Sequence, residues 1–355
     1  MGKKKNKKIK LAVLITVSIL LTFFILIVPA VTLFTYNQVF GVRYSTPPDY
    51  GYSIYNFPGL KADRYLFASN EGQILSSYCY YREDQDVKGV IIMSHGIGAG
   101  HNSYMDVADY FTRYGFCVFA YDVTGNDESE GSSIKGLPQG VIDLDYAITF
   151  VENTDAFKGL PILLFGHSWG GYSATSVLNE HPEVTAVCSV SGFNKSSDLL
   201  QAQGKSMVGP AFELMLPYLN LYERIKFGKY AVQTSMDGFE NSDAKVMIIH
   251  SEDDETVPII YGYDIYYASY SDDPDFVFVR YLDKGHSKIL SADGKSAYMN
   301  NLKNKYDLRF GRSSPSEEDI AAFYSEVVDE DQIPPLANAE LLDRVVDFYN
   351  SVLNG

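Results

Sequence analysis

A serine in a tight glycine turn is the first residue of this sequence whose surroundings indicate chemistry. An apolar run, 162–165, leads into Gly166-His167-Ser168-Trp169-Gly170-Gly171, and a stretch compatible with a helix follows. A Gly-x-Ser-x-Gly sequence between a strand and a helix presents its serine as a nucleophile. A side chain at Gly166 or Gly170 would collide with the neighbouring strand and helix. Taken alone, the pentapeptide fits an ordinary serine in a glycine-rich turn equally well.

A serine nucleophile needs a base, and the sequence offers six histidines. Five have other placements: His95 and His101 in a glycine loop, His167 in the serine turn, His181 before a proline at a helix end, and His250 at the end of a strand. His286, in Asp283-Lys284-Gly285-His286-Ser287, follows the last predicted core strand and lies in a loop. We therefore predict that His286 is the base.

The acid that orients this base is expected in the loop after the predicted strand Lys245–His250. The loop reads Ser251-Glu252-Asp253-Asp254-Glu255-Thr256-Val257-Pro258, a run that is also typical of a solvated loop. Spacing favours Asp254, with Asp253 as the alternative. The acid would hold the histidine in one tautomer and stabilise the imidazolium. The resulting chain order, serine then aspartate then histidine, is the one expected for an α/β sheet with this turn.

Acyl transfer also needs two backbone N–H groups that stabilise an oxyanion. One comes from the residue after the nucleophile, Trp169, and the other from a loop after an earlier strand. The predicted strand Gly89–Ser94 runs into His95-Gly96-Ile97-Gly98-Ala99-Gly100-His101, which makes Ile97 the second predicted donor. The alternative is a flexible glycine loop without this role.

The elements that must position these residues alternate between strand and helix patterns from about residue 62. Strands are predicted at 63–69, 73–81, 89–94, 116–121, 161–165, 184–190, 245–250 and 275–282, and helices at 104–114, 140–152, 168–179, 259–270 and 338–353. Such alternation predicts an α/β fold with a mostly parallel sheet and helices on both faces. The first two strands flank Asn70-Glu71-Gly72, which indicates a hairpin.

Two long insertions interrupt this alternation. Residues 194–243 contain apolar helical sequence, and residues 288–335 are rich in Gly, Ser, Asn and acidic residues. Insertions after strand ends gather at the carboxyl edge of the sheet, where ligands bind. Residues 194–243 are therefore predicted to form a helical cap, or else an extra helical pair without a gating role. Its apolar side chains favour an apolar acyl group in the substrate (Phe212, Leu214, Met215, Leu216 and Tyr218).

The N-terminus has the pattern of a membrane anchor. Residues 1–10 carry six lysines, and the uncharged apolar residues 11–34 would span about 36 Å as a helix, enough for a ~30 Å hydrocarbon layer. The lysines predict a cytoplasmic N-terminus and a catalytic domain outside the plasma membrane. The alternatives are a secretory signal cleaved near Val28-Pro29-Ala30 and a buried core helix. Residues 35–61 are predicted to be a linker, and 62–355 the catalytic domain.

Composition limits the remaining choices. The chain has 355 residues, 46% of them hydrophobic, and a net charge of −16 that becomes more negative without the N-terminal lysines. An acidic body of this kind argues against nucleic-acid binding. Three cysteines without a spacing pattern are predicted to be buried thiols (Cys79, Cys117 and Cys188). No metal or cofactor motif is present.

Together these motifs resemble the α/β-hydrolase superfamily, and within it the monoglyceride lipase, lysophospholipase and serine-aminopeptidase-like branch. The resemblance covers about residue 62 to the C-terminus. Residues Tyr121 to Gly131 also look like that branch's Asp-x-x-Gly-x-Gly-x-Ser turn, with Asp127 in place of the second glycine. The glycine usual after the acid-strand histidine is replaced by Ser251.

The resemblance implies a serine hydrolase that cleaves a small acyl ester or lipid-like substrate, and the N-terminal pattern predicts that it is anchored in the membrane. The alternatives are a serine exopeptidase that acts on short peptides and a non-catalytic surface-binding homologue.

Overall fold

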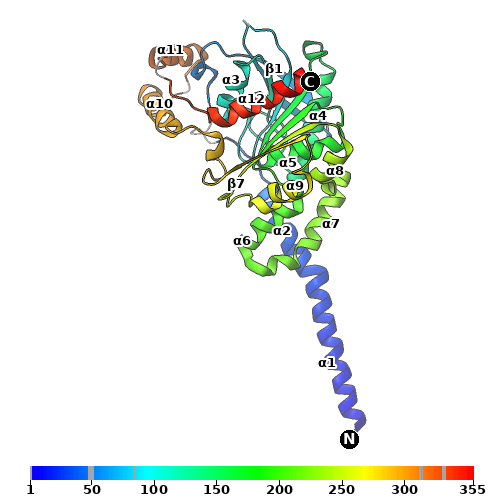
Figure 1. The fold of residues 1–355 in the computed structure, drawn as a ribbon. Helices are drawn as coiled ribbons and strands as arrows, with labels where there is room; N and C mark the ends of the chain where they lie inside the picture. Colours follow the sequence, from blue (N-terminus) through cyan, green and yellow to red (C-terminus); the bar gives the residue numbers. More distant parts are fainter. Residues whose placement is uncertain (1, 47–51, 84, 312, 314, 330–332) are drawn as a thin grey trace.

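A single eight-stranded sheet forms the centre of the protein, which we describe from a computed structural model covering residues 2–46, 52–83, 85–311, 313, 315–329 and 333–355 (Figure 1). Its spatial order is β1-β2-β4-β3-β5-β6-β7-β8. The strands are β1 (Lys61–Ala68), β2 (Ile74–Tyr81), β3 (Val90–Ser94), β4 (Cys117–Tyr121), β5 (Ile162–His167), β6 (Ala186–Val190), β7 (Lys245–Ser251) and β8 (Phe276–Tyr281). The hairpin β1–β2 pairs antiparallel, β2 joins β4 antiparallel, and every later pairing is parallel.

Helices cover both faces of this sheet, as the alternation predicted. On one face lie α4 (Leu137–Glu152), α5 (Trp169–Ser176) and α9 (Tyr263–Tyr270), and on the other lie α3 (Met105–Thr112) and α12 (Ala339–Asn354). Neighbouring strand residues point to opposite faces, so that Ile92 packs with the first group and Ile91 with the second. Burial on both sides explains why the central strands are continuous apolar runs. The predicted α/β-hydrolase fold class is confirmed.

Both insertions are helical. The first contains α6 (Ser196–Val208), α7 (Leu216–Phe227) and α8 (Ser235–Asn241), and the second contains α10 (Lys295–Phe310) and α11 (Glu317–Val327). We call α6, α7 and their connection the cap; α8 packs instead against α5. Figure 1 shows the cap at the end of the body from which the N-terminal helix projects, with α10 and α11 on another side.

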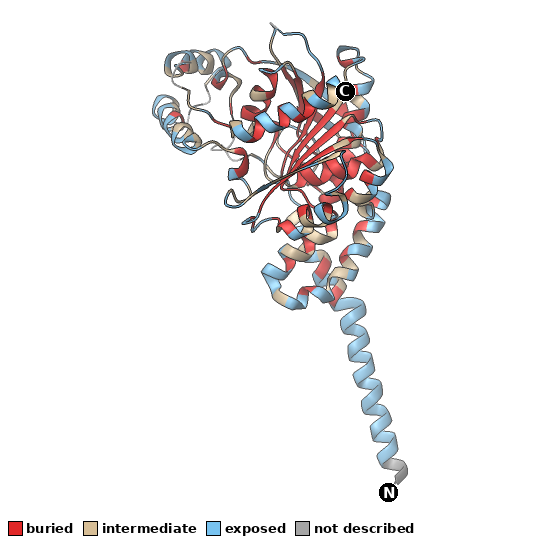
Figure 2. Cartoon of the chain, viewed as in Figure 1, coloured by how far each residue is buried: buried red, intermediate tan, exposed pale blue. Residues whose placement is uncertain are grey.

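The N-terminal helix is longer than the predicted apolar segment. It comprises α1 (Gly2–Thr22), a π-helical stretch (Phe23–Ile27) and α2 (Val28–Phe40), and so enters the predicted linker. Residues Lys5–Phe40 form one helix long and apolar enough to cross a membrane, and only 6% of its most apolar window is buried. Figure 2 shows α1 exposed along its described length. This exposure excludes the buried core helix. The predicted turn formers at 47–51 lie outside the described residues.

Burial of this helix against the rest of the protein begins at Val28. Its buried residues Val28, Thr32, Tyr36 and Phe40 are spaced by four and therefore form one stripe along α2. Further on, Asp127 accepts hydrogen bonds from the Thr46 N–H and hydroxyl, both at 2.6 Å. Asp127 has a φ of 34°, the left-handed conformation that favours the glycine usual at this place. Asp127, which replaces the second glycine of the family's turn, thus attaches the segment that follows α2 to the body.

Candidate active site

Ser168 lies on the turn between β5 and α5 with strained backbone angles, φ 58° and ψ −118°. A hydrogen bond from its N–H to the Val190 carbonyl, 2.8 Å long, holds the turn. A Cβ at Gly166 would lie 2.1 Å from the Gly170 carbonyl oxygen, and one at Gly170 would lie 1.9 Å from the Ser94 carbonyl oxygen. Both positions therefore need glycine, as the sequence predicted, and the turn exposes the serine hydroxyl at the carboxyl edge of the sheet.

His286 joins the predicted nucleophile to the predicted acid. Its Nε2 lies 2.9 Å from the Ser168 Oγ, and its Nδ1 lies 2.7 Å from the Asp254 Oδ2. Because a carboxylate only accepts, Nδ1 carries the proton and Nε2 is left with a lone pair facing the serine hydroxyl. The arrangement can remove a proton from Ser168.

The two candidate acids have different positions. Asp254 is buried beside His286, and its Oδ1 also accepts hydrogen bonds from the N–H groups of Thr256 and Val257. Burial opposes ionisation of Asp254, but hydrogen bonds from His250 and His286 outweigh it and lower the pKa of this carboxyl. Asp253 instead accepts from the Ser251 hydroxyl and the Gly285 N–H. The geometry thus favours Asp254 as the acid, whereas Asp253 stabilises the loop that carries His286.

The predicted oxyanion donors lie at the same edge. Trp169 is the first residue of α5, where an N–H has no partner within the helix. The Ile97 N–H makes no hydrogen bond to the part of the chain that the structure describes. A Cβ on the adjacent Gly96 would lie 3.4 Å from the Ser168 Cβ, so the glycine loop lies directly beside the serine. Both N–H groups are available for an oxyanion.

A hydrogen-bonded series that the sequence did not indicate connects the loops of the site. The Gly96 N–H donates to the Tyr104 hydroxyl, which donates to His167 Nδ1, while His167 Nε2–H donates to the His286 carbonyl. Burial, with the nearby His286, lowers the pKa of His167 to about 3, so its ring is neutral and has this single tautomer. His167, the variable residue of the serine turn, is thereby hydrogen-bonded to the loop of His286 directly and to the glycine loop through Tyr104.

A cavity of about 930 Å³ opens beside Ser168 and His286. One part is apolar and is lined by the cap and α2 (Leu199, Leu200, Met207, Phe212, Met215, Leu219, Tyr36, Val39 and Phe40). The other part is lined by polar residues of α10 and of the segment before α3 (Ser103, Lys295, Ser296 and Asn300). Of the cap residues expected to contact an acyl group, Phe212 and Met215 line the cavity. Leu214, Leu216 and Tyr218 are not among its lining residues.

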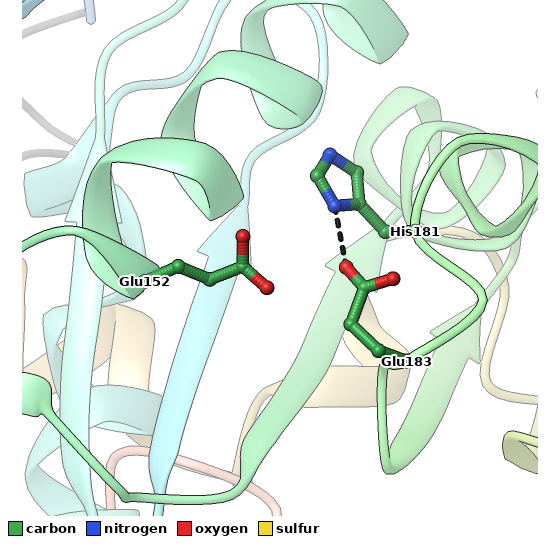
Figure 3. A group of neighbouring side chains, drawn as sticks. All are labelled: Glu152, His181 and Glu183. Carbon is green, nitrogen blue, oxygen red and sulfur yellow. Dashed lines mark hydrogen bonds and ion pairs between the residues drawn. The ribbon is translucent and has the colours of Figure 1, made fainter.

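A group of side chains away from this cavity has the composition of a metal site: Glu152, His181 and Glu183 (Figure 3). His181 Nδ1 lies 2.7 Å from Glu183, and its Nε2 lies 2.9 Å from Asp145. Burial alone would lower the pKa of His181, but these two bonds outweigh it and raise the pKa. Both ring nitrogens therefore act as donors, and the group is better described as an ion-paired cluster.

Ser168, His286, Asp254 and the glycine loop meet at the carboxyl ends of β3, β5, β7 and β8, an arrangement that defines the class of α/β hydrolases. Residues 85–230 match the family described as serine aminopeptidase, S33. That range includes Ile97, Ser168 and Trp169 and ends before Asp254.

Individual relatives agree with this class. Caffeoylshikimate esterase of Arabidopsis thaliana is 29% identical over 36% of this chain and 39% of its own length. Human monoglyceride lipase is 28% identical over 42% of this chain and 50% of its own length. The chain thus spans half or less of the length of these curated relatives. An esterase of Pyrococcus furiosus has the same fold, with a TM-score of 0.53 at 14% identity over 80% of this chain and 98% of its own. The fold is that of the α/β hydrolases, and the sequence similarity is to the serine aminopeptidase family and to monoglyceride lipases.

Proposed function

We propose that this protein is a serine hydrolase that cleaves carboxylic ester bonds of lipid-like substrates. The observation that carries the proposal is the uninterrupted hydrogen-bonded series from Asp254 through His286 to Ser168. The similarity to an esterase and to monoglyceride lipases supports the ester class.

The reaction follows from the geometry of these side chains. His286 Nε2 takes the hydroxyl proton of Ser168 while the serine oxygen attacks the ester carbonyl carbon. The negative charge that develops on the carbonyl oxygen is stabilised by the N–H groups of Ile97 and Trp169. His286 then returns the proton to the departing alcohol, which leaves an acyl-serine. A water activated by His286 adds to this acyl group and releases the acid, and Asp254 stabilises the imidazolium throughout.

The lining of the cavity separates ester hydrolysis from the aminopeptidase alternative. An aminopeptidase needs a free carboxylate for the substrate's ammonium group. Among the described residues, Asp106 is the one acidic residue that lines the cavity, and it already accepts from Lys295 at 2.7 Å and from the Tyr52 hydroxyl at 3.0 Å. With its charge matched in this way, Asp106 is a poor anchor for an amine. The large apolar wall of the cavity suits an acyl chain instead.

The test compares a series of p-nitrophenyl esters with aminoacyl-nitroanilides, with the full chain in detergent. We expect turnover of the esters and reaction of Ser168 with a fluorophosphonate probe. Turnover of the anilides alone would favour the peptidase. Absence of both turnover and labelling would instead favour the non-catalytic homologue, and equal labelling of Ser168→Ala would mean that Ser168 is not the nucleophile.

We also propose that the N-terminal helix remains as a membrane anchor, with its lysines in the cytoplasm and the catalytic domain outside the plasma membrane. The length of the helix and the low burial of its apolar part support this placement. Intact mass of the membrane-extracted protein tests it, because cleavage near Ala30 would remove the lysine block.

A further inference from the structure

The helix α2 has two unlike sides. Its buried stripe includes Thr32, Tyr36 and Phe40, which all line the cavity beside Ser168. On its other side, Val31 is 49% and Phe34 is 66% exposed, and both are apolar. Since residues 28–34 belong to the predicted membrane segment, one helix faces hydrocarbon on one side and the cavity on the other.

Thr32 is an unusual residue within this wall. Its side chain is fully buried, it lines the cavity, and its hydroxyl has no hydrogen-bond partner among the described residues. An unpaired buried hydroxyl is unfavourable, so such groups normally have a partner. A polar atom of a bound ester would supply one.

The cap also contacts the N-terminal helix before α2, within the predicted membrane segment. In the π-helical stretch the Val28 N–H bonds to the Phe23 carbonyl, and Pro29 has no N–H, so the Phe24 carbonyl lacks a partner within the helix. The Tyr218 hydroxyl of α7 donates to this carbonyl at 2.6 Å. Phe24 lies about 15 Å along the helix from the end of the predicted membrane segment at residue 34. An unsatisfied carbonyl is costly at that depth, and the cap satisfies it.

Further contacts attach the cap and body to the helix. Glu223 of α7 is buried and accepts from Tyr36 of α2 at 2.9 Å and from Ser196 of α6 at 2.6 Å. Beyond the helix, Arg43 donates to the Gly131 and Asp127 carbonyls. These bonds attach the helix to both the cap and the body. They therefore fix how the cavity is oriented relative to a membrane that the helix crosses.

The cap exposes large apolar side chains. Several of its large hydrophobic side chains are at least 48% exposed (Met207, Val208, Leu214, Leu221 and Ile225). Met207 and Val208 also line the cavity, so the cavity reaches the surface at this apolar edge. Surface of this kind is characteristic of a membrane contact.

We propose that α2 is a wall of the acyl-binding site and that the substrate, an ester lipid with one acyl chain and a small polar head, enters from the adjoining leaflet along α2 and the cap edge. The acyl chain packs between α2 and the cap, and the head group faces the polar part of the cavity near α10. A volume of about 930 Å³ is near the upper end of small-molecule pockets, ~300–1,000 Å³. The inference rests on the proposed ester hydrolysis and on an uncleaved helix.

The first test compares Thr32→Phe, which fills the cavity, with Phe34→Trp on the lipid-facing side of the same helix. The measurement is the ratio of kcat/KM for p-nitrophenyl hexadecanoate to that for the butanoate, with the full chain in detergent micelles. We expect the ratio to fall at least about tenfold for Thr32→Phe and to stay within about twofold for Phe34→Trp. Thr35→Leu, at a half-buried position of the same wall, repeats the test should Thr32→Phe fail to fold.

An unchanged ratio in the cavity-facing variants, or equal shifts in all three, would overturn the role of α2. A wild-type protein that neither hydrolyses the esters nor takes a fluorophosphonate label would overturn the proposed function instead.

The second test needs no activity. Bimane attached at Ile225→Cys should be quenched at least about twofold when the full chain is reconstituted in vesicles of brominated phosphatidylcholine rather than unbrominated lipid. Bimane at Leu308→Cys is the matched control, since Leu308 is also exposed (87%) but lies on α10. Equal quenching at both positions, or none at Ile225, would show that the cap does not contact the hydrocarbon.

Discussion

The loops around Ser168 and the cap are held by different kinds of interaction. The loops form a closed set of short polar contacts in which Tyr104, His167 and Asp253 each fix a neighbouring loop. The cap has few buried side chains; it packs against α2 and is joined to this helix by the hydrogen bonds of Glu223 and Tyr218, while its apolar side chains line the cavity. A polar network of this kind fixes positions closely, whereas an apolar surface tolerates changes of shape. Reaction rate and substrate choice are therefore expected to respond to different residues.

The largest effect is expected at the nucleophile. Ser168→Ala should lower kcat at least about 10⁴-fold for short and long esters alike, because no other hydroxyl can form the acyl intermediate. Turnover of both p-nitrophenyl esters, with fluorophosphonate labelling as the second readout, checks this. Residual turnover above one per cent would mean that another residue is the nucleophile.

The two neighbouring carboxylates offer a matched pair. Asp254→Asn should lower kcat by about 10³–10⁴, because an amide no longer holds the tautomer of His286 that accepts the serine proton. Asp253→Asn should lower it by about tenfold or less, since it alters only the bracing of the loop. Steady-state kinetics with p-nitrophenyl butanoate tests both variants. The reverse order of effects would make Asp253 the acid.

Tyr104→Phe tests whether the loops depend on one another. The change removes the acceptor of the Gly96 N–H and the donor to His167, each worth about 1–3 kcal/mol when left unpaired. We expect kcat to fall about tenfold for short and long esters equally. Tyr110→Phe on α3, the helix that follows Tyr104, serves as the control because its hydroxyl bonds to Asp343 instead. A loss confined to long esters would mean that Tyr104, like the cap, affects the choice of substrate and not the reaction itself.

The last prediction concerns the cap, where we expect an effect on stability and not on reaction rate. Burial raises the pKa of Glu223 to about 7, although Ser196 and Tyr36 donate hydrogen bonds to the carboxylate. A raised pKa means that the folded state binds the proton more tightly than the unfolded state, so stability is greatest below about pH 4.5 and is lost as the pH rises to about 7. The loss should not exceed about 3 kcal/mol.

Denaturant unfolding of the full chain in detergent at pH 5 and pH 8 measures this loss. Glu223→Gln should reduce the difference between the two pH values, because its amide does not titrate. An unchanged difference in the variant would assign the pH dependence to another group.

The sequence by itself predicted the sheet, the order of its strands and helices along the chain, and the candidate triad of Ser168, Asp254 and His286. Strand and helix patterns depend on side-chain periodicity, which is local, and Gly166 and Gly170 are required by the turn itself. The four loops then meet because the carboxyl ends of parallel strands share one edge. For the same reason His286 could be predicted by its place after the last core strand.

The tertiary structure decided which partners these residues have. The choice between Asp253 and Asp254 depends on the direction of two side chains in one loop, which no local pattern contains. The hydrogen bonds of Tyr104 and His167 join residues 63 positions apart. The wall formed by α2 depends on a stripe of four buried residues that begins within the apolar segment. In a mostly apolar, uncharged run the sequence does not indicate which side faces lipid and which faces protein.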